Sequence, residues 1–371
     1  MKKALLALSI LLVSFGMNLP ALPGTGAVEE RWWYMLEKGK RFHREGELGN
    51  ALVLFEDAIR TRQDYYTRLY QQLVEALSLP ELRRYGDDLS LVIAELRERS
   101  LLDALRAIDE TVRSVDDSKL GNSVNLLLEK LKNLAFYPEA EYQAGRVLAA
   151  EGEYVLALKR FESALDKGAS LLSEEERRSV LYATAGLYMA MGDHVAEEAT
   201  LLAILAEDNQ YASFSDPFIR QSLLKNASRE KGLDHVLALY RYPAPGFFEA
   251  HERLMQFYVS SRRWERARDH ALFAVLIAST TLIEELSWLN GSWQFSSLEE
   301  ACALAEKNWS LAEFIDSSSL YKNIYWMGVS AWYSDQRSLA QWAWRFVSGI
   351  KNAGEWRTRA LRQLHEPFED W

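Results

Sequence analysis

Histidine, cysteine and acidic side chains are the groups that most often bind metal ions or transfer protons in proteins. The chain has one cysteine, Cys302, and six histidines, at positions 43, 194, 235, 251, 270 and 365. No two histidines stand four residues apart on one predicted helix, and no HExxH or His/Cys grouping occurs. We therefore predict no metal site and, with a single cysteine, no internal disulfide.

Other catalytic motifs are also missing from the sequence. It contains no glycine-rich phosphate loop and no GxSxG nucleophile elbow. Acidic residues are plentiful, but on a helical chain of net negative charge they normally form a solvated face. We predict that the protein is not an enzyme and that it uses no cofactor.

The charge balance argues against nucleic acid as a partner. The chain carries 43 Lys and Arg against 53 Asp and Glu, for a formal net charge of −10. Proteins that grip nucleic acid need clustered Lys and Arg to neutralise phosphates. We expect no nucleic-acid binding.

Tryptophan is concentrated near the C-terminus. Nine of the twelve tryptophans follow residue 280, at 288, 293, 309, 326, 332, 342, 344, 356 and 371. These rings could stack on sugar rings and form a glycan-binding surface. Alternatively, they fill wide gaps between helices, because large aromatic side chains are commonly buried.

The first 27 residues are typical of a secretory signal peptide. Lys2 and Lys3 precede an apolar run from Ala4 to Leu19, and Thr25-Gly26-Ala27 offers small residues for cleavage. The run is shorter than the ~20 residues that a membrane-spanning helix usually needs. We expect a periplasmic or extracellular protein without an integral membrane segment after cleavage. The position of Cys302 excludes a cysteine-anchored lipoprotein.

Residues 137–168 predict two short helices folded back on each other. Pro138 suits the first turn of a helix, and Gly152 suits the left-handed residue that ends one. The second helix carries one apolar stripe from about Tyr154. We expect Gly145 and Ala157 to be small because the two helices cross there, and Phe161 and Ala164 to fill the gap toward the next pair of helices.

The same spacing recurs along the chain, and residues 31–62 reproduce its intervals at Gly39, Phe42, Gly46, Leu48, Ala51, Phe55 and Ala58. The matching residues of the first stretch are Gly145, Leu148, Gly152, Tyr154, Ala157, Phe161 and Ala164. This pattern resembles the tetratricopeptide repeat (TPR), a helix–turn–helix unit of about 34 residues. The resemblance implies an all-α fold, an α-solenoid or superhelix of roughly eight antiparallel helical hairpins.

In proteins of that family, the first helices of the repeats line a concave face that usually holds a peptide or a partner helix. The resemblance implies that this face carries Trp33, Lys40, His43, Arg44, Tyr142, Arg146, Tyr182, Tyr325 and Trp332. Rings mixed with basic groups suit an extended peptide that has acidic side chains or a free carboxylate end. Alternatively, these are ordinary surface or inter-repeat packing positions.

We divide the chain into a signal peptide (1–27), N-terminal repeats (28–242) and Trp-rich C-terminal repeats (247–371), because RYPAPG at 241–246 is the clearest break. The predicted function is an exported, non-enzymatic bacterial scaffold that binds a protein or peptide of the cell envelope. Two alternatives stay open. One is a glycan- or cell-wall-binding protein that uses the Trp-rich third, and the other is an accessory subunit of a periplasmic transport system.

Overall fold

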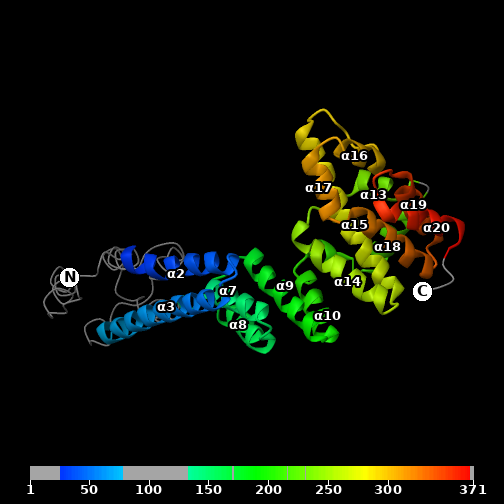
Figure 1. Ribbon diagram of the computed structural model, residues 1–371. Helices are drawn as coiled ribbons and strands as arrows, with labels where there is room; N and C mark the ends of the chain where they lie inside the picture. Colours follow the sequence, from blue (N-terminus) through cyan, green and yellow to red (C-terminus); the bar gives the residue numbers. More distant parts are fainter. Residues whose placement is uncertain (1–25, 78–132, 169–170, 215, 230, 368–371) are drawn as a thin grey trace, which may run out of the picture. The chain divides into compact units, whose positions relative to one another are not determined.

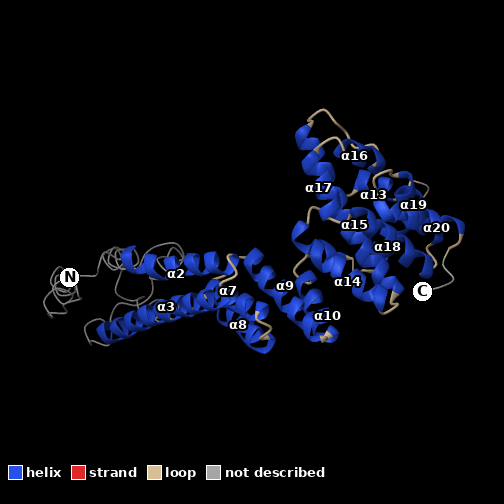
Figure 2. Cartoon of the chain, viewed as in Figure 1, coloured by secondary structure: helices blue, strands red, loops and turns tan. Residues whose placement is uncertain are grey.

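A computed structural model of the chain describes residues 26–77, 133–168, 171–214, 216–229 and 231–367. Every regular element in these ranges is a helix, which confirms the predicted all-α class (Figure 2). The chain divides into two compact units, Met1–Leu187 (unit 1) and Tyr188–Trp371 (unit 2). Residues 1–25 of the predicted signal peptide lie outside the described residues, as do 78–132, where we predicted further helical hairpins.

Unit 1 begins with two helical hairpins that follow the predicted pattern. Its helices are α2 (Gly26–Arg44), α3 (Leu48–Leu77), α7 (Pro138–Ala150), α8 (Tyr154–Gly168) and most of α9 (Glu174–Met191). The hairpins turn at Gly46 and Gly152, whose φ angles are +81° and +83°. Glycine adopts this left-handed conformation without the clash that a Cβ would cause, so each first helix ends there.

The two helices of each hairpin cross at a glycine that faces a phenylalanine ring. A Cβ built on Gly145 would stand 2.5 Å from Cε1 of Phe161, and one built on Gly39 would stand 2.6 Å from Cε1 of Phe55. Both rings are buried. The ring of the second helix therefore lies against the backbone of the first helix of the same hairpin. We had expected Phe161 to fill the gap toward the next pair of helices instead.

The two hairpins of unit 1 are direct neighbours although they are far apart in the sequence. Lys40 Nζ lies 2.6 Å from Glu139 Oε1, and Arg160 Nη2 lies 2.8 Å from Glu56 Oε1. Helix α7 packs against α3 and also contacts α2, beside the end of the α2–α3 pair where α2 turns into α3 (Figure 1).

Unit 2 is built from a series of antiparallel neighbours. Its elements are the end of α9, α10 (His194–Leu205), α11 (Asn209–Ser213), α12 (Pro217–Ala227), α13 (Leu233–Leu239), the 3-10 helix η1 (Pro245–Phe247), α14 (Phe248–Ser260), α15 (Trp264–Leu289), α16 (Leu298–Ala305), α17 (Trp309–Ser317), α18 (Leu320–Tyr333), α19 (Arg337–Gly349) and α20 (Gly354–His365). Helices α14 and α15 pack together, as do α15 and α18, α18 and α19, and α19 and α20. The glycine–aromatic crossing recurs here, because a Cβ on Gly328 would lie 2.7 Å from Nε1 of Trp344.

Helix α15 is the centre of unit 2. Besides α14 and α18 it contacts α13, α16 and α17, and every residue from Ala267 to Thr280 is buried. A helix that is apolar on all sides is normally enclosed by protein or lipid. Among the described helices, α15 alone is long and apolar enough to span a membrane, but 67% of its most apolar stretch is buried inside the unit.

The segment RYPAPG, where we predicted a break between two repeat arrays, lies inside unit 2. Tyr242 is fully buried, its backbone N–H donates to Thr280 Oγ1 at 3.0 Å, and its hydroxyl donates to Asp208. The prolines end the helical pattern as expected. Tyr242, which precedes both prolines, nevertheless joins this segment to α15.

The glycine–aromatic crossing yields a stability prediction. We expect Gly145→Ala to lower the free energy of unfolding by about 1–3 kcal/mol, because its Cβ would overlap the buried Phe161 ring. This loss would occur although alanine is intrinsically favoured over glycine inside a helix by roughly 1 kcal/mol. Urea unfolding followed by circular dichroism measures the change.

Gly186 provides the matched control, because it also lies inside a helix of unit 1 but has nothing within 4 Å of a Cβ built on it. Gly186→Ala is expected to leave stability unchanged or to raise it. Equal effects of the two substitutions would contradict the packing role assigned to Gly145.

Candidate functional site

Four of the predicted contact residues meet in one cleft of unit 1, which we name the basic cleft. Helices α2 and α7 form it, and its cavity volume is about 420 Å³. Its lining consists of Glu37, Lys40, His43, Arg44, Gln143 and Arg146. The structure therefore joins basic residues from two copies of the repeat pattern that are about a hundred positions apart.

Lys40 connects the two helices, α2 and α7, that form the cleft. Its Nζ donates to Glu37 Oε1 on α2 at 2.7 Å and to Glu139 Oε1 on α7 at 2.6 Å. Burial lowers the pKa of Lys40, but the hydrogen bonds to Glu139 and Glu37 raise it above its ordinary value overall. Because its charge is already compensated, we assign Lys40 to positioning the cleft rather than to attracting a ligand.

The two arginines provide the uncompensated charge. Arg44 and Arg146 are exposed, and neither forms an ion pair with a residue that the structure describes. Arg146 Nη1 donates to Gln143 Oε1 at 3.3 Å, which leaves most of the guanidinium available. Burial and the nearby Arg146 lower the pKa of His43, which favours its neutral form. An Arg pair of this kind suits carboxylates, which accept two parallel N–H bonds.

Three other predicted contact residues belong to unit 1. Trp33 lies on α2 and is 58% exposed. Tyr142 on α7 is half-buried, with its ring 5.6 Å from that of Phe161 and 5.8 Å from the Arg146 guanidinium. Tyr182 on α9 is half-buried as well. None of the three lines the basic cleft.

The two predicted contact residues of unit 2 belong to packed regions instead. Tyr325 is only 3% exposed and its ring lies 5.4 Å from that of Trp356. Trp332 is half-buried between Trp344 and the guanidinium of Arg337, at 5.6 and 4.9 Å from its ring. A ring buried in the core is not presented to a partner, which corrects the sequence-based placement of Tyr325.

Most of the described C-terminal tryptophans pack against the core of unit 2. Trp344 is fully buried, and Trp293, Trp326, Trp332, Trp342 and Trp356 are partly buried against the same cluster. Trp288 and Trp309 are exposed, at 81% and 79%. The glycan-binding alternative needs an exposed, coplanar set of rings, and the half-buried Trp293, Trp332 and Trp356 do not supply one.

No known family model matches the chain. The chain is similar to an uncharacterized protein of Treponema pallidum (strain Nichols), with 26% identity over 269 residues that cover 72% of each protein. A match of that length is longer than either unit alone, so it includes sequence from both units.

The structure also brings together two histidines that the sequence analysis treated as isolated. His251 on α14 and His270 on α15 are both buried, with their Nδ1 atoms 3.1 Å apart. Aromatic rings enclose the pair: Phe273 stacks on His251 at 5.1 Å and Tyr258 stacks on His270 at 5.4 Å. The spacing of 19 residues placed them on different helices and gave no signal of contact. The described residues contain no group of three or more His, Cys, Asp or Glu arranged to hold a metal ion.

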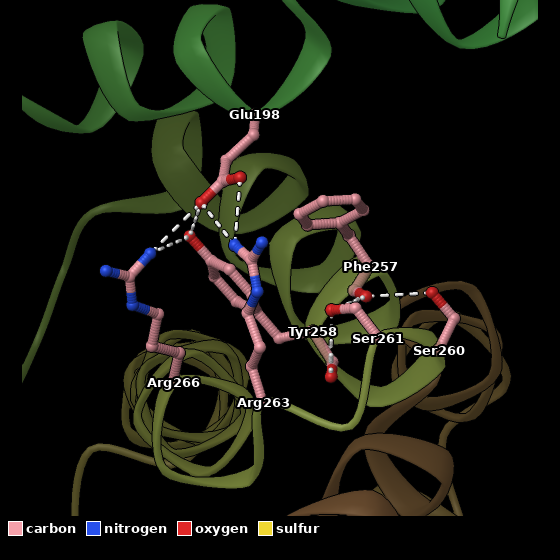
Figure 3. Close-up of polar contacts among 7 residues, drawn as sticks. All are labelled: Glu198, Phe257, Tyr258, Ser260, Ser261, Arg263 and Arg266. Carbon is pink, nitrogen blue, oxygen red and sulfur yellow. Dashed lines mark hydrogen bonds and ion pairs between the residues drawn. The ribbon is translucent and has the colours of Figure 1, made fainter. Parts of the chain in front are cut away.

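A polar network beside these histidines fastens α10 to the α14–α15 hairpin. The carboxylate of Glu198 accepts from the Tyr258 hydroxyl at 2.5 Å, from Arg263 at 3.2 Å and from Arg266 at 3.1 Å (Figure 3). Burial and the hydrogen bond to Glu198 raise the pKa of Tyr258 to about 12. The hydroxyl therefore keeps its proton and acts as a donor at neutral pH.

The histidine pair predicts that unit 2 loses stability in acid. Burial, and secondarily Arg266, lowers the pKa of His270 to about 3; burial and His270 lower that of His251 well below its usual value. In the unfolded chain both return to about 6.5. As the pH falls below about 6.5, only the unfolded chain gains these protons, so the free energy of unfolding decreases until the pH nears 3.

We expect the melting temperature, followed by tryptophan fluorescence, to fall between pH 7 and pH 4, and to fall less in His251→Gln/His270→Gln. Each buried histidine contributes up to about 1.4 kcal/mol per pH unit. Tryptophan fluorescence reports mainly on the unfolding of unit 2, because only Trp32 and Trp33 lie in unit 1. The control is His194→Gln/His365→Gln, which removes two exposed histidines of the same unit. If both pairs of substitutions change the pH dependence equally, the buried pair is not its source.

Proposed function

We propose that the protein is an exported, non-enzymatic scaffold of TPR-like architecture that binds a protein or peptide partner through the basic cleft. The observation that carries the proposal is that Arg44 and Arg146 lie in the same cleft. They come from equivalent helices of two repeat copies, they line one cleft, and they have no ion-pair partner among the described residues.

A recurring interval supports the TPR-like part of the proposal. Gly39 and Phe55, Gly145 and Phe161, and Gly328 and Trp344 each make the same close contact, and the two members of every pair stand 16 residues apart (39 to 55, 145 to 161, 328 to 344). Stacked hairpins bury their apolar faces only against one another, which leaves the first helices free to form a continuous surface. Unit 2 departs from this scheme at α15, which is enclosed on several sides.

The charge of the cleft favours a partner with acidic side chains or a free carboxylate end. Each of the two guanidinium groups in its lining can donate two parallel N–H bonds to a carboxylate, and Lys40 connects α2 with α7. The non-enzymatic part of the proposal rests on the sequence, which contains none of the catalytic motifs considered above.

The principal test reverses the charge of the cleft. We expect Arg44→Glu/Arg146→Glu to reduce capture of the native partner from envelope extracts at least about tenfold, because the new carboxylates repel an acidic partner. The melting temperature should shift by no more than about 2 °C, because both side chains are exposed and make little contact with the core.

The control Arg60→Glu/Lys159→Glu makes the same charge change on α3 and α8, outside the cleft, and should leave capture intact. Fluorescence anisotropy with a fluorescein-labelled hexaglutamate peptide measures carboxylate binding directly. Its C-terminal amide, which lacks the free terminal carboxylate, shows how much that group contributes. The proposal would be refuted if Arg44→Glu/Arg146→Glu lost much of its stability but still bound the partner. It would also be refuted if this variant and the control captured the partner equally well.

Export predicts a shorter mature protein. Cleavage after Ala27 would leave Val28 as the first residue and remove the basic start and the apolar run. The intact mass and N-terminal sequence of the protein isolated from the envelope fraction measure this. Recovery of the full chain from the cytoplasmic fraction would contradict it.

A further inference from the structure

Unit 2 contains an open cavity of about 1120 Å³ that is lined by residues of α10, α11, α12, α14 and α15, and we name it the C-terminal pocket. It lies wholly within unit 2 and shares no residue with the basic cleft. Small-molecule sites are typically concave, mostly apolar and about 300–1,000 Å³, with a few polar groups that orient the ligand. This cavity lies just above that size range, and its lining combines apolar side chains with an unusually large share of charged ones.

Charged side chains form one wall of the pocket. Asp269 is buried, and both Arg220 and Arg268 bind its carboxylate, with Arg268 Nη2 at 2.8 Å from Oδ1. Burial raises the pKa of Asp269 although the two guanidinium groups act to lower it. Arg268 also donates to Ser334 Oγ at 3.1 Å, so this part of the wall is held in place from two sides.

The remaining charges leave the pocket positive. Four basic and two acidic side chains line it, namely Arg220, Lys225, Arg266 and Arg268 against Glu265 and Asp269. Arg266 is paired with Glu198, which lies outside the lining, and Arg220 and Arg268 share the single carboxylate of Asp269. Lys225 is exposed and forms no ion pair with a residue that the structure describes. His270 adds no charge at neutral pH because its pKa is about 3. A positive pocket is unusual in a chain whose formal net charge is −10.

Apolar side chains form the rest of the lining. Leu202 is 36% exposed toward the pocket side of α10, and Tyr211 on α11 is half-buried. Phe214 and Leu224 lie behind them and join the pocket to the core of unit 2. A ligand therefore meets an apolar surface and a basic surface in the same cavity.

We propose that the C-terminal pocket binds a small organic anion with an apolar body. Its acidic group lies toward Lys225 and Arg220, and its apolar body lies against Leu202, Tyr211 and Leu224. The Arg268–Asp269 pair stays fixed in the wall and orients Arg220. This site is independent of the partner-binding cleft proposed for unit 1.

Two fluorescent probes that differ only in charge test the proposal. 8-Anilinonaphthalene-1-sulfonate carries an aromatic body and a sulfonate, and 1-anilinonaphthalene is the same body without the sulfonate. We expect the folded full-length protein to bind one sulfonate probe per chain at its strongest site. The neutral probe should bind there at least about fivefold more weakly, because it cannot use the cationic wall.

Pocket variants then locate the site. Lys225→Gln/Arg220→Gln should weaken binding of the sulfonate probe at least about fivefold and change that of the neutral probe less than twofold. Ala212→Trp, which fills the pocket without changing its charge, should weaken both probes. The control Arg345→Gln/Lys351→Gln removes two exposed cations that do not line the pocket and should change neither.

Sulfonate binding that is unaffected by the pocket variants, or equally tight binding of the two probes, overturns the proposal. Equal weakening of both probes by Lys225→Gln/Arg220→Gln also overturns it, since the site would then recognise apolar surface alone. If loss of the Arg220–Asp269 pair unfolds unit 2, Lys225→Gln alone decides the question, because Lys225 is exposed and makes no ion pair with a described residue.

Discussion

The described parts of both units depend on helices that cross closely enough for an aromatic ring to lie against the backbone of the preceding helix. At Gly145 and Gly328 the ring of Phe161 or Trp344 occupies the space that a Cβ would need. Dense packing of this kind fixes the distance between the two helices of a hairpin. It also fixes which face of the first helix points away from the second. The basic cleft is built on that outward face of α2 and α7.

Ion pairs select how one hairpin of unit 1 sits on the next. Arg160 binds Glu56 of the preceding hairpin and Glu141 of its own, and Lys40 binds Glu139. Surface ion pairs contribute only about 0–1 kcal/mol each, so the apolar contacts between α3 and α7 supply most of the stability. The ion pairs instead favour one register of the two hairpins, because a displacement of α7 along α2 would separate the paired charges. Arg44 and Arg146 take no part in these ion pairs.

Local regularities of the fold could be predicted from the sequence, and distant contacts could not. The turns at Gly46 and Gly152 and the small residue at Gly145 follow from residue types and from the 3.6-residue period of a helix, but the contact of Phe161 with Gly145 in the same hairpin was not predicted. The meeting of α2 with α7, and so the cleft, depends on which hairpins stack. Spacing along the chain shows the apolar face of a helix but not the partner that covers it. The contact between His251 and His270 was missed for the same reason.

Helix α15 shows how a few polar residues decide the environment of an apolar helix. Its composition would suit a membrane, yet Arg268 and Asp269 lie within its buried run. Two buried charges are tolerated only when they are paired and hydrogen-bonded. Arg220 from α12 and Ser334 beyond α18 complete that pairing, so α15 satisfies its charges only when those elements surround it. The same Arg268, Asp269 and Arg220 side chains line the C-terminal pocket, so the residues that satisfy the charges of the central helix also form the charged wall of that pocket.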